Sequence, residues 1–172
     1  DLKADETQEW FRGFVAENPQ LRANHPTLGL DNQIYIASGL RGGDVGPGRD
    51  WATVWGGAGA VDSGAAPKAP VSLSGRDFRF DPLTGAFEAV TGPGQFGLTF
   101  DDWGNRFLCD NRHPCKHVVL EERFLKRNPD LRIASTYQDV SAQGEQSRLY
   151  PLSRAWTTSN LHAHQYTAAC GL

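Results

Sequence analysis

The densest group of reactive side chains in this sequence lies within residues 109–117, which read CDNRHPCKH. A carboxylate, an amide, a guanidinium group and an imidazole follow one another at Asp110, Asn111, Arg112 and His113. An imidazole titrates near neutral pH and can move a proton, while amide and guanidinium groups bind and neutralise anions. This stretch is therefore the first candidate for a functional site. The alternative is an exposed loop in which Arg112 and His113 bond to backbone carbonyls.

The three cysteines, Cys109, Cys115 and Cys170, fit neither a CxxC zinc pair nor the CxxCH attachment of a haem. One disulfide plus one free or intermolecular thiol is the simplest count, but three reduced buried cysteines fit the sequence equally well. A Cys109–Cys115 disulfide would close a small loop and preorganise the side chains inside it, or it would only staple that loop. Zinc on these two cysteines with His113 and His117 has suitable ligand types but no standard spacing, so we predict no metal site.

Further side chains suited to chemistry are scattered along the chain. His25 precedes a proline, Arg41 lies in the sequence GLRGG, and His162 and His164 are two residues apart. On a strand, two such histidines face the same side and could bind a metal or cofactor together. The structural alternatives are that His25 caps a turn and that Arg41 is a solvated loop cation.

Aromatic and acidic residues offer weaker candidates. Trp51, Trp55 and Trp103 could form a sugar-stacking surface, although tryptophans more often fill cores. Asp101 and Asp102 lie in a turn, where aspartate commonly accepts backbone hydrogen bonds, so a catalytic acid pair is not expected.

The elements that must position these residues are predicted to be short strands. The chain has 172 residues, of which 39% are hydrophobic, so it can bury one core of ordinary size. Its 19 glycines and 10 prolines predict many turns. Alternating apolar residues and turn signals predict a strand within residues 1–15, hairpins over 28–38, 76–90 and 96–109, one helical turn over 121–130, and strands within 131–150 and 161–172. The fold is therefore expected to be all-β.

Two of the predicted hairpins resemble each other. Each has an apolar strand end, at Leu28 or Leu98, then a turn that begins with Asp31 or Asp101, and then an aromatic strand. Propeller blades repeat at about 40 to 50 residues, so a blade that carries the glycine-rich segment 39–70 as a long loop insertion explains the larger offset. We predict a partial β-propeller with long glycine-rich loops, in one unit over residues 1–172.

Composition excludes several classes of function. The formal charge is −3 and lysine and arginine are scattered, so we expect no nucleic-acid partner. No run of 18 apolar residues exists, and residues 1–10 lack the features of a signal peptide. Residues 1–172 are therefore not expected to contact a membrane. The sequence contains no methionine, and we expect it to be processed, excised or partial.

A longer resemblance is carried by the residues GRDFRFDPLTGAFEAV, GQFGLTFDDWGNRFLCDNRHPCKHVVLEERFLKRNP and TAACG. They resemble a bacterial family of membrane-bound dehydrogenases related to sorbosone dehydrogenase, whose N-terminal domain looks like the six-bladed propeller of soluble quinoprotein glucose dehydrogenase. The resemblance covers most of the chain and implies about two to three blades. It also implies a periplasmic or otherwise extracytoplasmic location, and either a quinone with calcium or a haem on another domain as cofactor.

The resemblance implies a dehydrogenase-like segment that acts on a sugar or alcohol. His25 or His113 would be the base, and Arg41, Asn111, Arg112 and His162 would bind the cofactor on the central face. The partners would be the small-molecule substrate and the remaining blades or another chain. The alternatives are a non-catalytic module that binds a glycan or a partner, and a structural subunit of an electron-transfer assembly.

Overall fold

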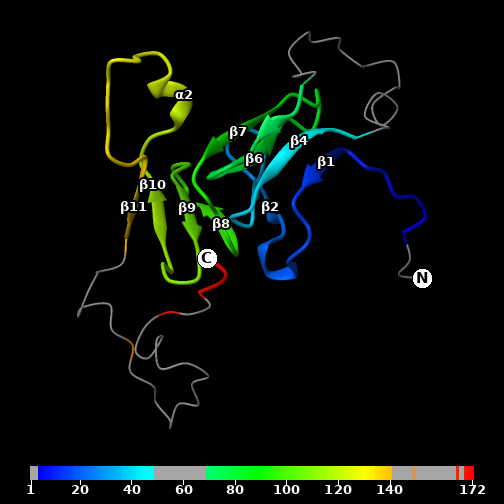
Figure 1. The fold of residues 1–172 in the computed structure, drawn as a ribbon, viewed down its shortest axis with the longest axis horizontal. Coiled ribbons are helices and arrows are strands. Elements are labelled where there is room, and N and C mark those ends of the chain that lie inside the picture. The colour runs from blue at the N-terminus through cyan, green and yellow to red at the C-terminus, as the bar shows by residue number, and fades with distance from the viewer. Residues whose placement is uncertain (1–3, 49–68, 141–148, 150–165, 167–168) are drawn as a thin grey trace.

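The computed structural model describes residues 4–48, 69–140, 149, 166 and 169–172. Its two largest sheets are four-stranded and antiparallel (Figure 1). The first has the order β2 (Asn24–Leu28), β3 (Ile34–Ala37), β6 (Arg76–Phe80), β7 (Phe87–Thr91). The second has the order β8 (Gly97–Phe100), β9 (Arg106–Cys109), β10 (Lys116–Val118), β11 (Tyr137–Asp139).

A smaller antiparallel sheet joins β1 (Phe11–Phe14), β4 (Gly43–Pro47) and β5 (Val71–Ser72). The helical elements are a 3₁₀ turn at Pro19–Leu21 and the helical turn α2 at Glu122–Leu125. The prediction of an all-β fold is confirmed. In the part of the chain that the structure describes, no helix has the length and apolar character needed to cross a membrane.

Local turn chemistry explains why the predicted hairpins form. In the β6–β7 hairpin, Asp81 Oδ1 accepts the backbone N–H groups of Leu83 (2.7 Å) and Thr84 (3.1 Å). Gly85 follows with φ of +74°, a left-handed conformation that glycine adopts at little cost. In the β8–β9 hairpin, Asp101 Oδ1 likewise accepts the N–H groups of Trp103 and Asn105. The three predicted hairpins and the helical turn are all present.

Two apolar clusters hold the sheets together. One lies between the two four-stranded sheets and consists of Tyr35, Ala37, Val90, Leu98, Leu108 and Val118. The other lies between the first sheet and the β1–β4–β5 sheet and consists of Val45, Leu73, Phe78, Phe80 and Phe87, with Phe11 in edge contact with the rings of Phe78 and Phe87. Both faces of the first sheet are therefore covered, and Asp77 and Arg79 on β6 are buried along with Phe78 and Phe80.

The structure departs from the sequence-based expectation at several places. The segment 39–70 was expected to be loop, but Gly43–Pro47 forms β4 because its backbone pairs with β1 and β5. Within residues 131–150, only Tyr137–Asp139 is a described strand. Trp103 is 84% exposed at a hairpin turn and fills no core. Trp51, Trp55 and His162 lie outside the described residues.

Candidate functional site

The strand register brings most of the predicted site residues to one end of the two large sheets. Asn24 at the start of β2 pairs with Ala37 at the end of β3, and Gly97 at the start of β8 pairs with Cys109 at the end of β9. The chain therefore enters or leaves both sheets on the same side at residues 24–25, 38–41, 94–95 and 110–115. We call these four segments the loop end.

Five predicted site residues belong to the loop end. His25 and Arg41 are exposed, and His25 has φ of +53°. Asn111 and Arg112 are exposed, whereas His113 is half-buried. From the sequence, these residues were expected to lie together only if the fold is a propeller. The strand register places them at one end of the two large sheets without that assumption.

Hydrogen bonds to Gly94 and Gln95 join the segments of the loop end. Asn24 Nδ2 donates to the carbonyl of Gln95 at 2.7 Å, and the backbone N–H of Asn111 donates to Gln95 Oε1 at 3.1 Å. The N–H of Gly39 donates to the carbonyl of Gly94 at 2.9 Å. Gln95 thus connects the segment that carries His25 to the segment that carries His113.

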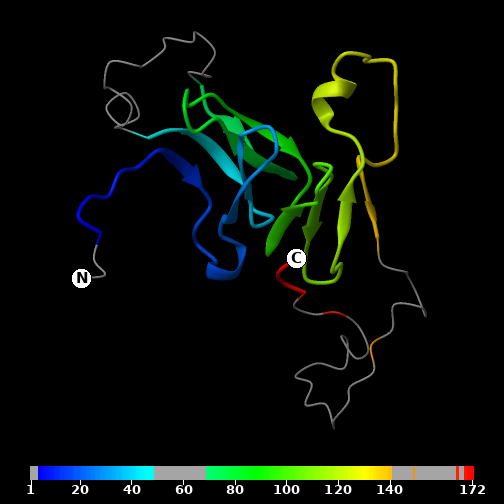
Figure 2. The ribbon, with the colours of Figure 1, turned by 180° about the vertical axis from the view of Figure 1, so that it is seen from behind.

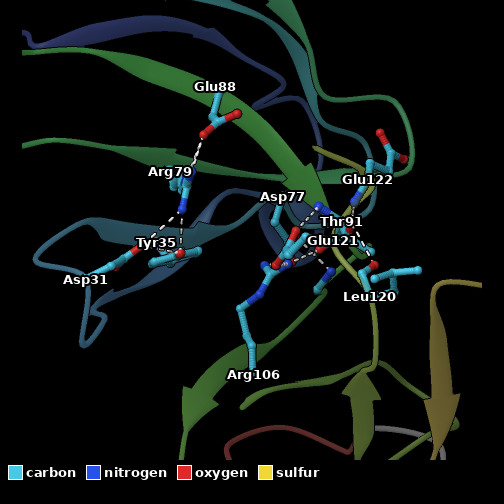
Figure 3. Close-up of polar contacts among 11 residues, drawn as sticks. Asp31, Tyr35, Asp77, Arg79, Glu88, Thr91, Arg106, Leu120, Glu121 and Glu122 are labelled. Carbon is cyan, nitrogen blue, oxygen red and sulfur yellow. Dashed lines mark hydrogen bonds and ion pairs between the residues drawn. The ribbon is translucent and has the colours of Figure 1, made fainter. Parts of the chain in front are cut away.

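A buried carboxylate beneath the loop end fixes two of its segments. Asp77 Oδ1 accepts the backbone N–H groups of Ser38 (3.0 Å) and Gly94 (2.9 Å), and its Oδ2 lies 3.5 Å from Arg106 Nη1 (Figure 3). Burial raises the pKa of Asp77 to about 7, although the Arg106 charge and the two N–H donors act in the opposite direction. Asp77 therefore joins the start of the 38–41 segment to the 94–95 segment.

Arg106 extends this contact from β6 to the second sheet. Its Nη2 donates to Glu121 Oε1 at 2.8 Å and to the carbonyl of Thr91, and its guanidinium group lies 5.3 Å from the ring centroid of Tyr35 (Figure 3). Arg79 lies 5.6 Å from the same ring, bonds to the Tyr35 hydroxyl at 2.8 Å and pairs with Glu88. These two arginines order the scaffold, and sequence reasoning missed both because their partners lie on other strands.

Asp110 organises the loop that carries the predicted base. Its Oδ1 accepts the backbone N–H groups of Arg112 (2.9 Å) and His113 (3.0 Å) and lies 2.8 Å from His113 Nδ1. Its Oδ2 lies 2.5 Å from Lys116 Nζ. Burial works to raise the pKa of Asp110, but the Lys116 bond and the N–H donors outweigh it and lower the pKa. An ionised Asp110 accepts a hydrogen bond from Nδ1–H and so leaves the lone pair of His113 on Nε2.

His113 opens into a pocket of about 480 Å³. The pocket is lined by His113, Lys116, Ser135, Tyr137, Gln138 and Asp139. His113 Nε2 lies 3.9 Å from Asp139 Oδ2, and Lys116 Nζ lies 5.2 Å from the ring centroid of Tyr137. A small polar ligand in this pocket would meet an imidazole, an ammonium group and a carboxylate together.

A second pocket of about 440 Å³ lies at the opposite end of the sheets. Its lining includes the aromatic rings of Tyr35, Phe100 and Phe124 and the carboxylates of Asp31 and Glu121. Phe124 is 48% exposed. None of the predicted site residues that the structure describes lines this cleft.

The sequence left the pairing of the three cysteines open, and in the structure Cys109, Cys115 and Cys170 are all free thiols. The bonds to Asp110 described above hold this loop instead. His117 stacks on Phe107, with ring centroids 5.0 Å apart, and takes no part in the His113 pocket. Among the residues that the structure describes, no three histidine, cysteine or acidic side chains gather as a metal site would require.

Comparison with known proteins gives one match. The model of a protein family described as Domain of unknown function (DUF7133) matches residues 1–172. No curated protein and no solved structure matches the chain.

Proposed function

The chain belongs to the family described as Domain of unknown function (DUF7133), and from the loop end we propose that it is part of an extracytoplasmic oxidoreductase that oxidises a sugar or another alcohol. The observation that carries the proposal is the His113–Asp110 pair, 2.8 Å between Nδ1 and Oδ1, beside the pocket. The sequence resemblance to dehydrogenases of the sorbosone type supports the same reaction class and the same location.

The chemistry follows from the orientation of the His113 ring. Asp110 holds Nδ1–H, so Nε2 takes the hydroxyl proton of the substrate, and the Asp110 charge stabilises the imidazolium that forms. Lys116 keeps Asp110 ionised throughout. The hydrogen on the carbinol carbon leaves with its electron pair, and the substrate becomes an aldehyde, ketone or lactone. We prefer His113 over His25 as the base because Asp110 orients its ring.

The oxidation requires a two-electron acceptor, and the proposal assigns this role to a quinone, which accepts the hydride when bound. Arg41 and Arg112 are exposed at the loop end and would hold an anionic quinone by charge, with Asn111 as a hydrogen-bonding neighbour. The proposal assigns no residue of this part of the chain to calcium.

The arrangement of the two large sheets supports a further proposal, that this chain is part of a β-propeller. Both large sheets are four-stranded antiparallel sheets, as propeller blades are. The first strands of the two sheets, β2 and β8, lie next to each other. Thr27 Oγ1 of β2 donates to the carbonyl of Leu98 on β8 at 3.4 Å. Corresponding first strands meet in this way when blades surround a common channel. We therefore propose that the two sheets are adjacent blades and that the segment 39–70 is an insertion in the first of them.

The test is a dye-coupled assay on the full-length protein with a panel of sugars and alcohols, with and without added quinone and calcium. We expect His113→Gln to lower kcat by about 10²- to 10⁴-fold, the contribution of a general base. His117→Gln is the matched control and should keep wild-type kcat, because His117 stacks on Phe107 away from the pocket. Absence of turnover with every substrate would refute the enzyme proposal, and an unchanged kcat in His113→Gln would refute the role of His113.

A second candidate function is glycan binding without turnover, and the cleft at the opposite end of the sheets favours it. Aromatic rings beside carboxylates suit the apolar face and the hydroxyl groups of a sugar. Glycan binding that Phe124→Ala abolishes and His113→Gln leaves intact would support this alternative.

A further inference from the structure

Cys109 is buried on a face of β9 that does not point into the core. Neighbouring residues alternate along this strand, with Arg106 and Leu108 buried toward the first sheet and Phe107 stacked on His117 on the other face. Cys109 shares the face of Phe107, yet its side chain is fully buried. Something outside the sheet must therefore cover it.

The C-terminal residues 169–172 provide this cover. The backbone N–H of Gly171 donates to the thiol of Cys109, and the N–H of Ala169 donates to the carbonyl of Asn111 at 3.4 Å. A side chain added at Gly97, the β8 residue that pairs with Cys109, would lie 3.6 Å from Cys109 Sγ and 3.6 Å from Gly171 Cα. Figures 1 and 2 both show these C-terminal residues beside β8.

This placement brings a second cysteine to Cys109. Cys170 lies between Ala169, which is bonded to Asn111, and Gly171, which lies beside the Cys109 thiol, so the chain carries Cys170 alongside Cys109. From this geometry we propose that Cys109 and Cys170 form a disulfide that fastens residues 169–172 to the loop end. The proposal does not depend on the oxidoreductase activity.

Cys115 is the competing partner, because continuation of the β9–β10 register would place it opposite Cys109. Two observations favour Cys170. Burial is the main cause of the raised pKa of Cys109, and the electrostatic interaction with Cys170 raises that pKa further. Burial alone raises the pKa of Cys115. Cys170 is also exposed, so a reagent in solution can reach it.

The bond forms by two thiol–disulfide exchanges with a small disulfide such as oxidised glutathione. The Cys170 thiolate attacks the reagent, forms a mixed disulfide and releases one glutathione thiolate. The Cys109 thiolate then attacks the Cys170 sulfur, forms the protein disulfide and releases the second glutathione. The two protein thiols lose two electrons and two protons, and one oxidised glutathione becomes two reduced molecules.

The disulfide would also position the candidate site. Asn111 belongs to the loop that Asp110 folds around His113, and its carbonyl is bonded to Ala169. A covalent link at Cys170 makes that contact permanent, so residues far apart in the sequence share one rigid unit at the loop end.

Peptide mapping after trypsin tests the proposal directly, because the sequence separates all three cysteines. Cleavage after Arg106, Arg112, Lys116 and Arg154 places Cys109 in FLCDNR, Cys115 in HPCK and Cys170 in AWTTSNLHAHQYTAACGL. The full chain is equilibrated in glutathione buffer, alkylated, digested without reduction and analysed by mass spectrometry. We expect a cross-linked FLCDNR–AWTTSNLHAHQYTAACGL species and alkylated HPCK.

Two single substitutions complete the test. Cys115→Ser should leave the cross-linked species unchanged, and Cys170→Ser should abolish it and leave Cys109 to be alkylated once the protein is unfolded. A Cys109–Cys115 species as the main product, or three alkylated cysteines in wild type under conditions that oxidise a control dithiol peptide, would overturn the proposal. Cys170 and Cys115 are not in the buried core, so both variants should fold, which circular dichroism checks.

Discussion

Replacing Asp77 by asparagine should change how the stability of the protein depends on pH. In the folded protein, burial raises the pKa of Asp77 to about 7, whereas the ordinary value is 3.8. Between these two values the folded state holds a proton that the unfolded state has released. The stability that this carboxyl contributes is therefore fully present below about pH 4 and is lost as pH rises through about 7. Asparagine has a similar shape and does not titrate.

The size of the effect follows from proton linkage. One proton that is bound only in the folded state changes the free energy of unfolding by about 1.4 kcal/mol per pH unit. Over the interval between the two pKa values this amounts to a change on the order of 4 kcal/mol. The stability of wild type relative to Asp77→Asn should therefore fall by about this amount between roughly pH 4 and pH 7, and then level off.

Urea denaturation of both proteins, at a series of pH values from about 4 to about 8, measures this difference. Asp81, Asp101 and Asp110 have lowered pKa values and lose stability in acid, but they do so in both proteins and cancel in the comparison. A difference that stays constant with pH would refute the reasoning, because it would mean that Arg106 and the two backbone donors fully offset burial. A difference that increases with pH would show that the pKa of Asp77 is lowered.

Three further predictions concern stability. Phe78→Ala should cost about 3 to 5 kcal/mol in urea denaturation, because Phe78 is fully buried, while Trp103→Ala at an exposed turn should change stability by less than about 0.5 kcal/mol. Gly39→Ala should destabilise more than Gly75→Ala in the same assay; both have positive φ, but an added Cβ at Gly39 meets a backbone carbonyl and at Gly75 meets nothing. If the proposed disulfide forms, oxidised wild type should exceed oxidised Cys170→Ser by about 4 kcal/mol, the value for a closed loop of roughly 60 residues, and equal stabilities would contradict that pairing.

An element of the fold could be predicted where the residues that shape it are close to it in the sequence. The hairpin over 76–90 was predictable because Asp81 and Gly85, which shape its turn, are adjacent to the strands they join. Strand β4 was not predictable, because its glycine-rich sequence has low strand propensity and is held by pairing with β1 and β5. Pairing between distant segments overrides local propensity at this point.

The same distinction applies to the candidate site. His113 and its neighbours were found because they are consecutive in the sequence, and the partner Asp110 was visible in the same stretch. The Asp77–Arg106 contact joins different sheets, and neither residue carries a sequence signal for the other. Gln95 was missed for the same reason, since its two partners lie on segments before and after it in the chain.

The pairing of β4 with β5 fixes the chain on both sides of residues 49–68. Asp44 pairs with Ser72 and Val45 with Val71, and the N–H of the fully buried Leu73 bonds to the carbonyl of Gly43 at 2.8 Å. The chain on either side of residues 49–68 is thus clamped before it reaches the loop end. The strand pairing that holds residues 43–47 and 71–72 therefore does not depend on the contacts around His113, and the two parts of the scaffold can be altered separately.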